Sequence, residues 1–464
     1  MSAPYITLPE WRARVAYAGS PLYLGAGRHG PVFAPPQQGL LVLGPPRSGK
    51  TTSLVVPNLL LAPGAVVVTS TKPDVMAATW QERSRLGQCW LFDPSGLMPA
   101  PPGVERLQWS PVPGCYDWDG ALRTARAMTL AARPGGYHGD QSHWTERAES
   151  LLAPLLHAAA RGGMGIDEVA TWIHHHDTSV ASAIVFNDGS RVAWDTLFGL
   201  TETEDRELSG IFSTAAGVIA AYKSDHVLAQ AREPNFDAGV LQSTSDTVYV
   251  CASGRDQSLT APLVIGLLEQ IRAGAYQSTT AAVERNTWPG PPLSLFLDEA
   301  ANIAPIPDLP AIVSEGASQG VITMACFQDL SQARARWGQQ ADGFMTLFGT
   351  NVVLGGIRDI RTLDQISRLA GDVEVPHNSV TRRPWPVGRQ HTSVTYSTHR
   401  QPRLPVDLIA QLPPGQSILL NGPRPPGLLQ LTPWFRTPPF TEARRPLELP
   451  PPEKERTRRS GRSL

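Results

Sequence analysis

Lysine is scarce in this chain. Only four lysines occur among its 464 residues, although lysine and arginine together number 40. A lysine that stands inside a glycine-rich motif is therefore a rare coincidence unless the motif has a function. The four positions are Lys50, Lys72, Lys223 and Lys454.

Cysteine and long hydrophobic runs are also scarce. The four cysteines lie far apart and form no C-x-x-C pair, which favours buried reduced thiols over a disulfide framework or a zinc site. The nearly apolar stretch 59–68 contains Pro63 and Gly64, and a membrane span needs roughly eighteen or more apolar residues. The N-terminus has no positively charged start before an apolar run, so we expect no secretory signal. These absences predict a soluble, globular, cytoplasmic protein.

Residues 44–51 read GPPRSGKT and match the phosphate-binding P-loop (Walker A) pattern. The backbone N–H groups of such a loop surround phosphate oxygens, Lys50 reaches the β- and γ-phosphates, and the Thr51 hydroxyl ligates Mg²⁺. An apolar run at 39–43 suits a buried strand and 52–61 suits a helix, which is the required setting. We therefore expect ATP and Mg²⁺ as cofactors. The predicted nucleotide-binding residues are Gly44, Pro45, Pro46, Arg47, Ser48, Gly49, Lys50, Thr51 and Thr52.

A second apolar run, LSLFLDEA, ends in Asp298 and Glu299. A buried strand would bring both carboxylates to the carboxyl edge of the sheet, where ligands bind in open α/β folds. We expect Asp298 to hold Mg²⁺ together with Thr51, and Glu299 to orient or deprotonate the attacking water. Gln328, at the end of the predicted strand VITMACFQD, would sense the γ-phosphate or position water, or would simply cap the strand. The predicted catalytic residues are Lys50, Glu299 and Gln328.

Short β-branched or aromatic runs alternate with helical stretches in both halves of the chain, which predicts an α/β fold with a mainly parallel sheet. Between them lies a long stretch with helical periodicity and almost no strand-like alternation. Segment 372–404 is polar and is interpreted as an irregular excursion or a hairpin. The predicted domains are a lead-in segment 1–38, a nucleotide-binding core in 39–114 and 234–436, an all-helical insertion 115–233, and a Pro/Arg-rich, disordered tail 437–464.

Charge is unevenly distributed around a net charge of −1. Residues 115–233 carry nine basic against sixteen acidic residues, whereas residues 441–464 carry seven basic against four acidic ones. We therefore expect the insertion to bind a basic partner with salt-sensitive affinity. The basic tail suits phosphate or acidic lipid, although charged tails are often merely solvated.

One segment combines arginine with tryptophan in the manner of single-strand nucleic-acid binders. A plain exposed loop is the competing interpretation of this segment, TRRPWPVGRQ. DNA contact of this kind would be directed at phosphates and indifferent to base sequence. The candidate DNA-contacting residues are Arg382, Arg383, Trp385 and Arg389.

The ordered set of segments resembles the conjugative coupling ATPases of type IV secretion, the TraG/TraD-type DNA pumps related to the FtsK and HerA motors. The resemblance runs from about Leu40 to Trp434 and rests on GPPRSGKT, VVTSTK, WLFDPSG, LSLFLDEAANIAPIPDL, ACFQDLSQ, TNVVLGGIRDIRTLDQIS and LPPGQSILLNGPRPP. It implies a RecA/FtsK-like P-loop NTPase core with an inserted all-helical domain, and a homo-hexamer with ATP between subunits and DNA through the centre. It also implies a relaxase or accessory protein at the helical domain, and type IV secretion channel proteins as partners.

The chain departs from this family pattern in two places. Members commonly begin with two membrane-spanning helices, whereas this chain starts almost directly at the core, so we expect a partner to anchor it at the inner face of the membrane, if it is anchored at all. Members also often carry a trans-acting arginine after a glycine, where this chain has Ala317. The candidate substitutes are Arg334, Arg336 and Arg358.

Three functions fit these residues. The first is an ATP-driven translocase that delivers relaxase-bound conjugative DNA to a secretion channel. The second is a nucleotide-gated recruitment module that hydrolyses ATP slowly, which Ala317 favours. The third is a cytosolic DNA-processing motor of the FtsK/HerA type.

Overall fold

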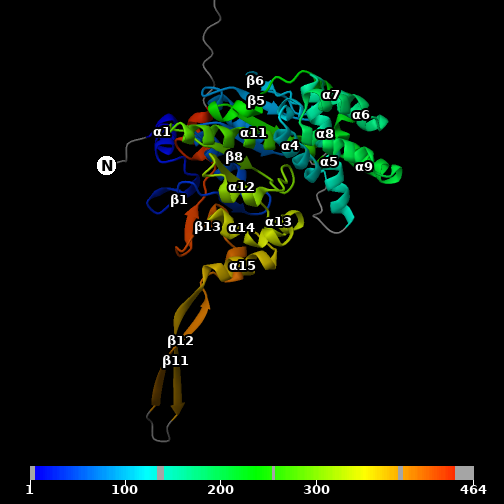
Figure 1. The fold of residues 1–464 in the computed structure, drawn as a ribbon. Coiled ribbons are helices and arrows are strands. Elements are labelled where there is room, and N and C mark those ends of the chain that lie inside the picture. Colours follow the sequence, from blue (N-terminus) through cyan, green and yellow to red (C-terminus); the bar gives the residue numbers. More distant parts are fainter. Residues whose placement is uncertain (1–5, 133–139, 253–256, 385–389, 445–464) are drawn as a thin grey trace, which may run out of the picture.

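The structure is a computed structural model that describes residues 6–132, 140–252, 257–384 and 390–444. Twelve strands of the described chain form one sheet in the order β2-β1-β14-β13-β10-β3-β9-β8-β4-β7-β5-β6 (Figure 1). From β10 to β6 neighbouring strands are parallel, and the other pairs are antiparallel. The strands are β1 (Tyr23–Gly27), β2 (Gly30–Phe33), β3 (Leu40–Leu43), β4 (Val66–Ser70), β5 (Cys89–Phe92), β6 (Val104–Arg106), β7 (Thr247–Cys251), β8 (Leu293–Leu297), β9 (Val321–Phe327), β10 (Thr350–Leu354), β13 (Gln416–Asn421) and β14 (Gly427–Gln430).

Helices cover both faces of this sheet. Side chains of successive strand residues point to opposite faces, so Leu41 and Leu43 of β3 join one buried cluster and Leu40 and Val42 join the other. The first cluster includes α11 (Gln257–Glu284) and α12 (Leu309–Glu315). The second includes residues of the π-helical turn Thr51–Val55, α2 (Val56–Leu61) and α3 (Asp74–Arg83). The parallel pairing from β10 to β6 confirms the predicted α/β class with a mainly parallel sheet. Parallel sheets usually have both faces buried, as this one does.

Between β6 and β7 the described chain contains helices but no strand. They are α4 (Trp118–Ala131), α5 (Asp140–Arg161), α6 (Ile166–His175), α7 (Ser179–Asp188), α8 (Arg191–Thr201), α9 (Asp205–Val218) and α10 (Asp225–Arg232), with short 3-10 turns. Figure 1 shows α6 to α9 gathered at one end of the molecule, beside the sheet. An all-helical insertion is what the sequence predicts, and its domain boundaries stay a prediction.

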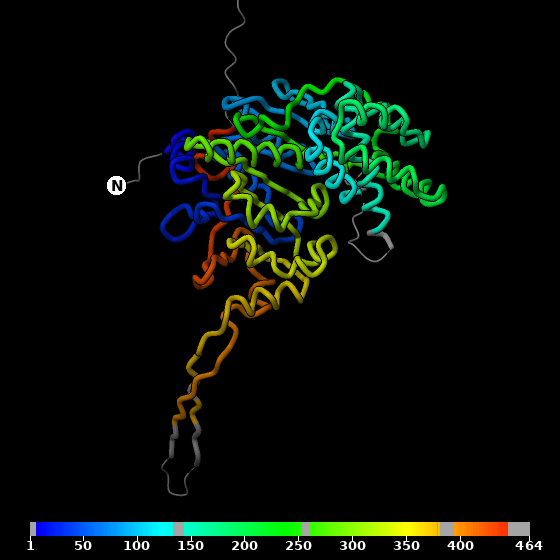
Figure 2. Tube along the Cα trace, viewed as in Figure 1, coloured from blue at the N-terminus to red at the C-terminus, as the bar shows by residue number. Residues whose placement is uncertain are grey.

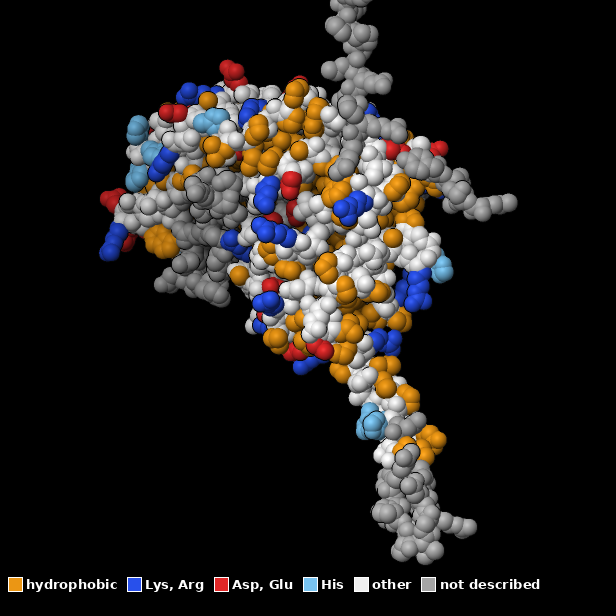
Figure 3. Space-filling view, turned by 180° about the vertical axis from the view of Figure 1, so that it is seen from behind, with side chains coloured by type: hydrophobic (Ala, Val, Ile, Leu, Met, Phe, Trp, Pro, Cys, Tyr) orange, Lys and Arg blue, Asp and Glu red, His pale blue; other side chains and the backbone are white. Residues whose placement is uncertain are grey.

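The segment after α15 (Ile360–Ala370) is a hairpin rather than an irregular excursion. Strands β11 (Asp372–Pro384) and β12 (Gln390–Pro402) pair antiparallel in an unbroken register. This two-stranded ribbon projects away from the body (Figure 1), and hydrophobic side chains lie on its surface (Figure 3). At its base the Arg403 N–H donates to the Gly371 carbonyl across 2.8 Å, so the two ends of the excursion meet.

The two ends of the described chain pack together. Trp11 of α1 (Leu8–Tyr17) contacts Phe440 with ring centroids 5.9 Å apart, and it packs against the buried cluster that contains Phe440 and Tyr23 of β1. Figure 2 shows the blue and red ends of the trace side by side. The predicted lead-in segment therefore supplies two strands to the sheet, and the predicted tail is packed as far as residue 444; its remainder lies outside the described residues.

The remaining helices are short. They are α13 (Leu330–Trp337) and α14 (Phe344–Phe348), which lie between β9 and β10, and α16 (Val406–Ala410), which follows the ribbon. Within the described residues, no helix combines the length and the apolar character that crossing a bilayer requires.

Candidate functional site

The predicted site residues meet at the carboxyl edge of the parallel strands. The P-loop follows β3, Asp298 and Glu299 follow β8, and Gln328 follows β9. Because β9 lies between β3 and β8 in the sheet, the three strand ends are adjacent, and the sheet order alone brings segments distant in sequence to one place.

The P-loop backbone needs glycine at two positions. A Cβ on Gly44 would lie 2.8 Å from the Ser48 Oγ and 2.9 Å from the Leu354 Cβ, and Gly49 has a φ of +102°. Arg47 also has a positive φ of 63°, a conformation that costs free energy outside glycine. The loop is thus held in a tight turn whose next residues begin the π-helical turn Thr51–Val55. Irregular turns of this type are frequent at functional sites.

Two polar groups of the loop fit an anion. The Lys50 side chain is 6% exposed, and its ammonium donates to the carbonyl oxygens of Gly44 and Pro45. It forms no ion pair with a carboxylate of the described residues, although a buried charge normally requires one. The buried Ser48 hydroxyl also has no hydrogen-bond partner in the described chain. A phosphate group would satisfy both side chains.

Thr51 and Asp298 are in direct contact. The Thr51 hydroxyl donates to Asp298 Oδ2 across 2.9 Å. Burial raises the pKa of Asp298 to about 6, as does the neighbouring Glu299 charge, while the Thr51 hydrogen bond and Lys50 act in the opposite direction. A hydroxyl and a carboxylate are the oxygen ligands that Mg²⁺ prefers, and a cation here would favour the charged form of Asp298. The donor set therefore fits a magnesium ion.

Glu299 stands beside Asp298 in a constrained conformation. Its φ is +59°, and its Oε2 accepts a hydrogen bond of 3.1 Å from the Asn302 side-chain amide. The sequence-based reasoning missed Asn302, although its position three residues after Glu299 was a usable signal. Gln328 is half-buried, and its backbone N–H donates to Gln332 Oε1 across 3.0 Å. This bond fixes the backbone of Gln328 in a local turn at the carboxyl end of β9.

The three arginine candidates differ in their contacts. Arg334 forms ion pairs with Asp359 and Asp342 and is 14% exposed. The Arg336 Nε donates to the Ala301 carbonyl across 2.9 Å. Arg358 is exposed and forms no ion pair with any carboxylate that the structure describes. It follows β10 in the loop whose Gly356 approaches Pro45 of the P-loop, so its backbone lies at the same sheet edge.

Ala317 and the DNA-contact candidates lie away from this edge. Ala317 follows α12 in the turn that precedes β9. Arg382 and Arg383 are in β11, paired with Thr392 and His391 of β12. Trp385 and Arg389 lie outside the described residues.

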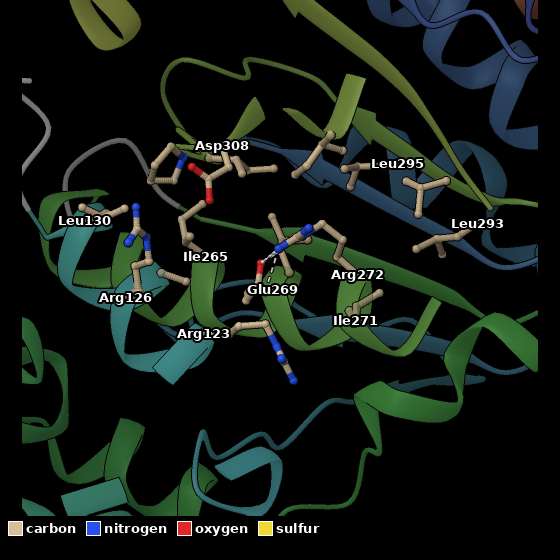
Figure 4. Close-up of a pocket in the computed structure, with 16 residues that line it drawn as sticks. Arg123, Arg126, Leu130, Ile265, Glu269, Ile271, Arg272, Leu293, Leu295 and Asp308 are labelled. Carbon is tan, nitrogen blue, oxygen red and sulfur yellow. Dashed lines mark hydrogen bonds and ion pairs between the residues drawn. The ribbon is translucent and has the colours of Figure 1, made fainter. Parts of the chain in front are cut away.

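A hollow lies between the helical insertion and the core (Figure 4). Its volume is about 80 Å³. In its middle, Arg272 and Glu269 of α11 form an ion pair, and these side chains are 22% and 11% exposed. Burial raises the pKa of Glu269, while the charge of Arg272 opposes that effect. The lining residues are Arg123, Arg126, Ala127, Leu130, Ile265, Leu268, Glu269, Ile271, Arg272, Leu293, Leu295, Ile306, Pro307, Asp308, Ile312 and Val321. The hollow thus contacts α4 of the insertion and the 306–308 segment that follows Glu299.

Comparison with solved structures supports the fold. Bacterial conjugative coupling protein TrwBdeltaN70 superimposes with a TM-score of 0.67 at 18% identity, over 93% of this chain and 95% of that one. Plasmid coupling protein TrwB in complex with ADP and Mg²⁺ superimposes with a TM-score of 0.62 at 19% identity, over 85% of each chain. At these identities the likeness establishes the fold alone.

Comparison of sequences establishes the family. Conjugal transfer protein TraG of Escherichia coli is 23% identical over 428 residues, which cover 81% of this chain and 61% of that relative. The family model for Type IV secretory system Conjugative DNA transfer matches residues 10–452. Since that match takes in nearly the whole chain, the resemblance expected from the motifs is confirmed: the protein belongs to the type IV secretory system conjugative DNA transfer family.

Proposed function

We propose that this protein is an ATP-hydrolysing translocase that delivers relaxase-bound conjugative DNA to a type IV secretion channel. The observation that carries this proposal is the contact of Thr51 with Asp298 at 2.9 Å, next to a buried Lys50 that has no carboxylate partner in the described chain. A P-loop and an acidic strand end are useful for nucleotide hydrolysis only when they converge, and here they do.

Each residue of the site has a role in this reaction. The P-loop backbone and Lys50 bind the β- and γ-phosphates, and Thr51 and Asp298 would hold Mg²⁺. Bound there, the ion would supply positive charge that offsets the negative charge developing on the phosphates. Glu299 orients the attacking water and accepts its proton, and Asn302 fixes the direction of the Glu299 carboxylate. Gln328 follows β9, the strand between those that precede the P-loop and Glu299, and it positions water or senses the γ-phosphate.

The proposed partners follow from charge and family. The helical insertion, with sixteen acidic against nine basic residues, suits a basic relaxase or accessory protein. DNA contact without base specificity is assigned to the ribbon, whose strand β11 carries Arg382 and Arg383. A homo-hexamer located in the cytoplasm, or held at the inner face of the membrane by a channel protein, is the assembly that this function requires.

The second function, slow nucleotide-gated recruitment, is favoured by one observation. Ala317 cannot supply a trans arginine, and Arg334 is held by Asp359 and Asp342. Without such an arginine the transition state loses a stabiliser that is commonly worth about 10³- to 10⁵-fold in rate. The isolated subunit is therefore expected to bind nucleotide well and to turn it over slowly.

The deciding experiment measures ATPase activity of the purified chain with and without single- and double-stranded DNA, alongside its mass in solution. The translocase function predicts turnover that DNA stimulates. Tight nucleotide binding with turnover near background under every condition, even in the oligomer, would reject the motor in favour of the recruitment module.

A further inference from the structure

The helical insertion carries an exposed aromatic patch formed by α7 and α8. Phe186 and Phe198 are 61% and 50% exposed, and the Trp194 ring lies between them. Trp194 stacks on Phe198 with centroids 5.1 Å apart and an interplanar angle of 13°, and it is 5.5 Å from Phe186. Val192, which is 59% exposed, adjoins them in sequence. We call these four residues the α7–α8 patch.

Phe186, Phe198 and Val192 are not part of the buried core of the insertion, whereas Trp194 is partly buried and packs against that core. Ala181 and Val185 already bury the inner face of α7, and Ala193 and Leu197 do the same for α8. A surface helix normally has a polar outer face. Exposed aromatic residues in a contiguous group are instead typical of interaction sites, where they supply most of the binding free energy.

The surroundings of the patch are acidic. Residues 177–207 contain seven acidic residues and two basic ones, a net charge of −5. The protein itself shows what fits there, because the Arg191 guanidinium lies 4.6 Å from the Trp194 centroid and also pairs with Asp195. A cation on an aromatic ring with a carboxylate beside it is therefore an arrangement that this surface already forms once.

We propose that the α7–α8 patch is a docking surface for an arginine-rich segment of a partner protein. Guanidinium groups stack on aromatic rings and are more weakly hydrated than the lysine ammonium, so arginine gains more than lysine from such a surface. The acidic surroundings attract the segment and speed its association. The biological role of this docking surface rests on the proposed function, because a delivered protein needs a receptor. The binding of arginine to the patch does not depend on that function.

The test measures binding of labelled oligoarginine, oligolysine and oligoglutamate peptides of equal length to the full chain, without DNA. We expect oligoarginine to bind most tightly and oligoglutamate not to bind. Phe186→Ala and Phe198→Ala should each weaken oligoarginine binding roughly five- to tenfold, since each removes a stacking surface. Trp288→Ala is the matched control, because Trp288 is 75% exposed but lies outside the insertion, and it should leave binding unchanged. The thermal unfolding midpoint should be the same in all variants.

Two results would overturn the proposal. One is equal binding of oligoarginine and oligolysine that neither phenylalanine variant weakens, which would show attraction by charge alone. The other is concentration-dependent self-association that the phenylalanine variants abolish while peptide binding persists, which would show that a second copy covers the patch.

Lys50→Ala separates this inference from the proposed function. This variant should lose ATPase activity and keep oligoarginine binding. If the wild-type chain itself shows no ATPase activity but still binds oligoarginine through its aromatic rings, only the proposed motor function is refuted.

Discussion

At the residue scale, nucleotide binding and hydrolysis depend on different side chains. Lys50 is buried without a carboxylate partner in the described chain, so its charge is available for phosphate, whereas Glu299 is placed to act on water. We expect Lys50→Ala to abolish nucleotide binding. Glu299→Gln should preserve binding and lower kcat by about 10²- to 10⁴-fold. Fluorescent-nucleotide binding and steady-state ATPase assays measure both effects, with the exposed Glu284→Gln as a control that should behave as wild type.

Asn302 is a positioning residue for the same reaction. Its amide donates to Glu299 Oε2, while Glu299 itself has a positive φ. Losing a hydrogen bond to a charged group costs about 1.5–3 kcal/mol, so Asn302→Ala should lower kcat roughly tenfold or more. The nucleotide KM should stay unchanged, because the side-chain amide of Asn302 donates to Glu299 and not to the P-loop. A rise in KM at constant kcat would instead assign Asn302 to nucleotide binding.

At the element scale, α11 contributes a buried ion pair to the junction between insertion and core. Arg272→Ala leaves the Glu269 carboxylate buried and unpaired, which typically costs about 3–5 kcal/mol of unfolding free energy. Without Arg272 the pKa of Glu269 rises further above its ordinary value. A carboxyl group whose pKa is raised in the folded state loses stability as the pH rises through that pKa, so the variant should be less destabilised in mildly acid than in neutral buffer. Urea unfolding at several pH values measures this dependence.

The double variant Glu269→Leu/Arg272→Met is the control for the ion pair. Replacing both partners with apolar residues of similar volume removes the unpaired charge, so its destabilisation should be smaller than that of Arg272→Ala. Equal destabilisation of the single and double variants would mean that the loss comes from packing.

The ribbon is an element that the body does not need. An isolated two-stranded hairpin is only marginally stable in water, and the Arg403–Gly371 hydrogen bond closes its base. Replacing residues 372–402 by a short glycine-containing turn should therefore leave the thermal unfolding midpoint and the basal ATPase unchanged. If the ribbon contacts phosphates, DNA affinity should fall and its dependence on log salt concentration should become shallower. Unchanged DNA affinity and salt dependence would remove the ribbon from the DNA-binding surface.

The sequence predicted elements best where local pattern decides the structure. The motif GPPRSGKT lies between a strand and a helix, as predicted, because one local turn dictates its residue types. The run LSLFLDEA contains the predicted strand, because burial dictates its apolar residues. Strands β1, β2 and β14 were not anticipated, since such short strands are stabilised mainly by pairing with their neighbours in the sheet. The long helix α11 extends over Gln257–Glu284. Its outer turns are specified by packing against the rest of the molecule rather than by periodicity.

Side-chain partnerships between distant segments were less predictable. The Thr51–Asp298 contact followed from the P-loop motif and the acidic end of a buried strand, but the ion pairs of Arg334 with Asp342 and Asp359 depend on how α13 and α15 pack. The aromatic patch was also missed, because Phe186 and Phe198 are identified as exposed only after Val185 and Leu197 are known to face inward.

At the scale of the whole molecule, the proposed hexamer would bring an arginine of one subunit to the nucleotide site of its neighbour. Arg334 and Arg336 are engaged by their own subunit, so Arg358 is the best candidate. We expect the wild-type chain with a non-hydrolysable ATP analogue and Mg²⁺ to sediment at about six times its monomer mass of 50.1 kDa. Lys50→Ala should remain monomeric, because it cannot bind the nucleotide at the interface. Assembly of that variant to the same mass would separate oligomerisation from nucleotide binding.

Mixing two inactive variants shows whether Arg358 acts on its neighbour. Arg358→Ala alone should bind nucleotide normally and lose about 10³-fold or more in kcat, and Glu299→Gln alone should be similarly slow. In a mixed ring, a subunit with Glu299 intact can sit beside one with Arg358 intact, so one complete site forms at their boundary and ATPase activity should return in part. The loop that contains Arg358 approaches Pro45 of its own P-loop. If Arg358 served the site of its own subunit, no pair of neighbouring subunits in the mixed ring could combine an intact Arg358 with an intact Glu299 in one site. The mixture would then stay inactive, because each subunit would carry its own defect.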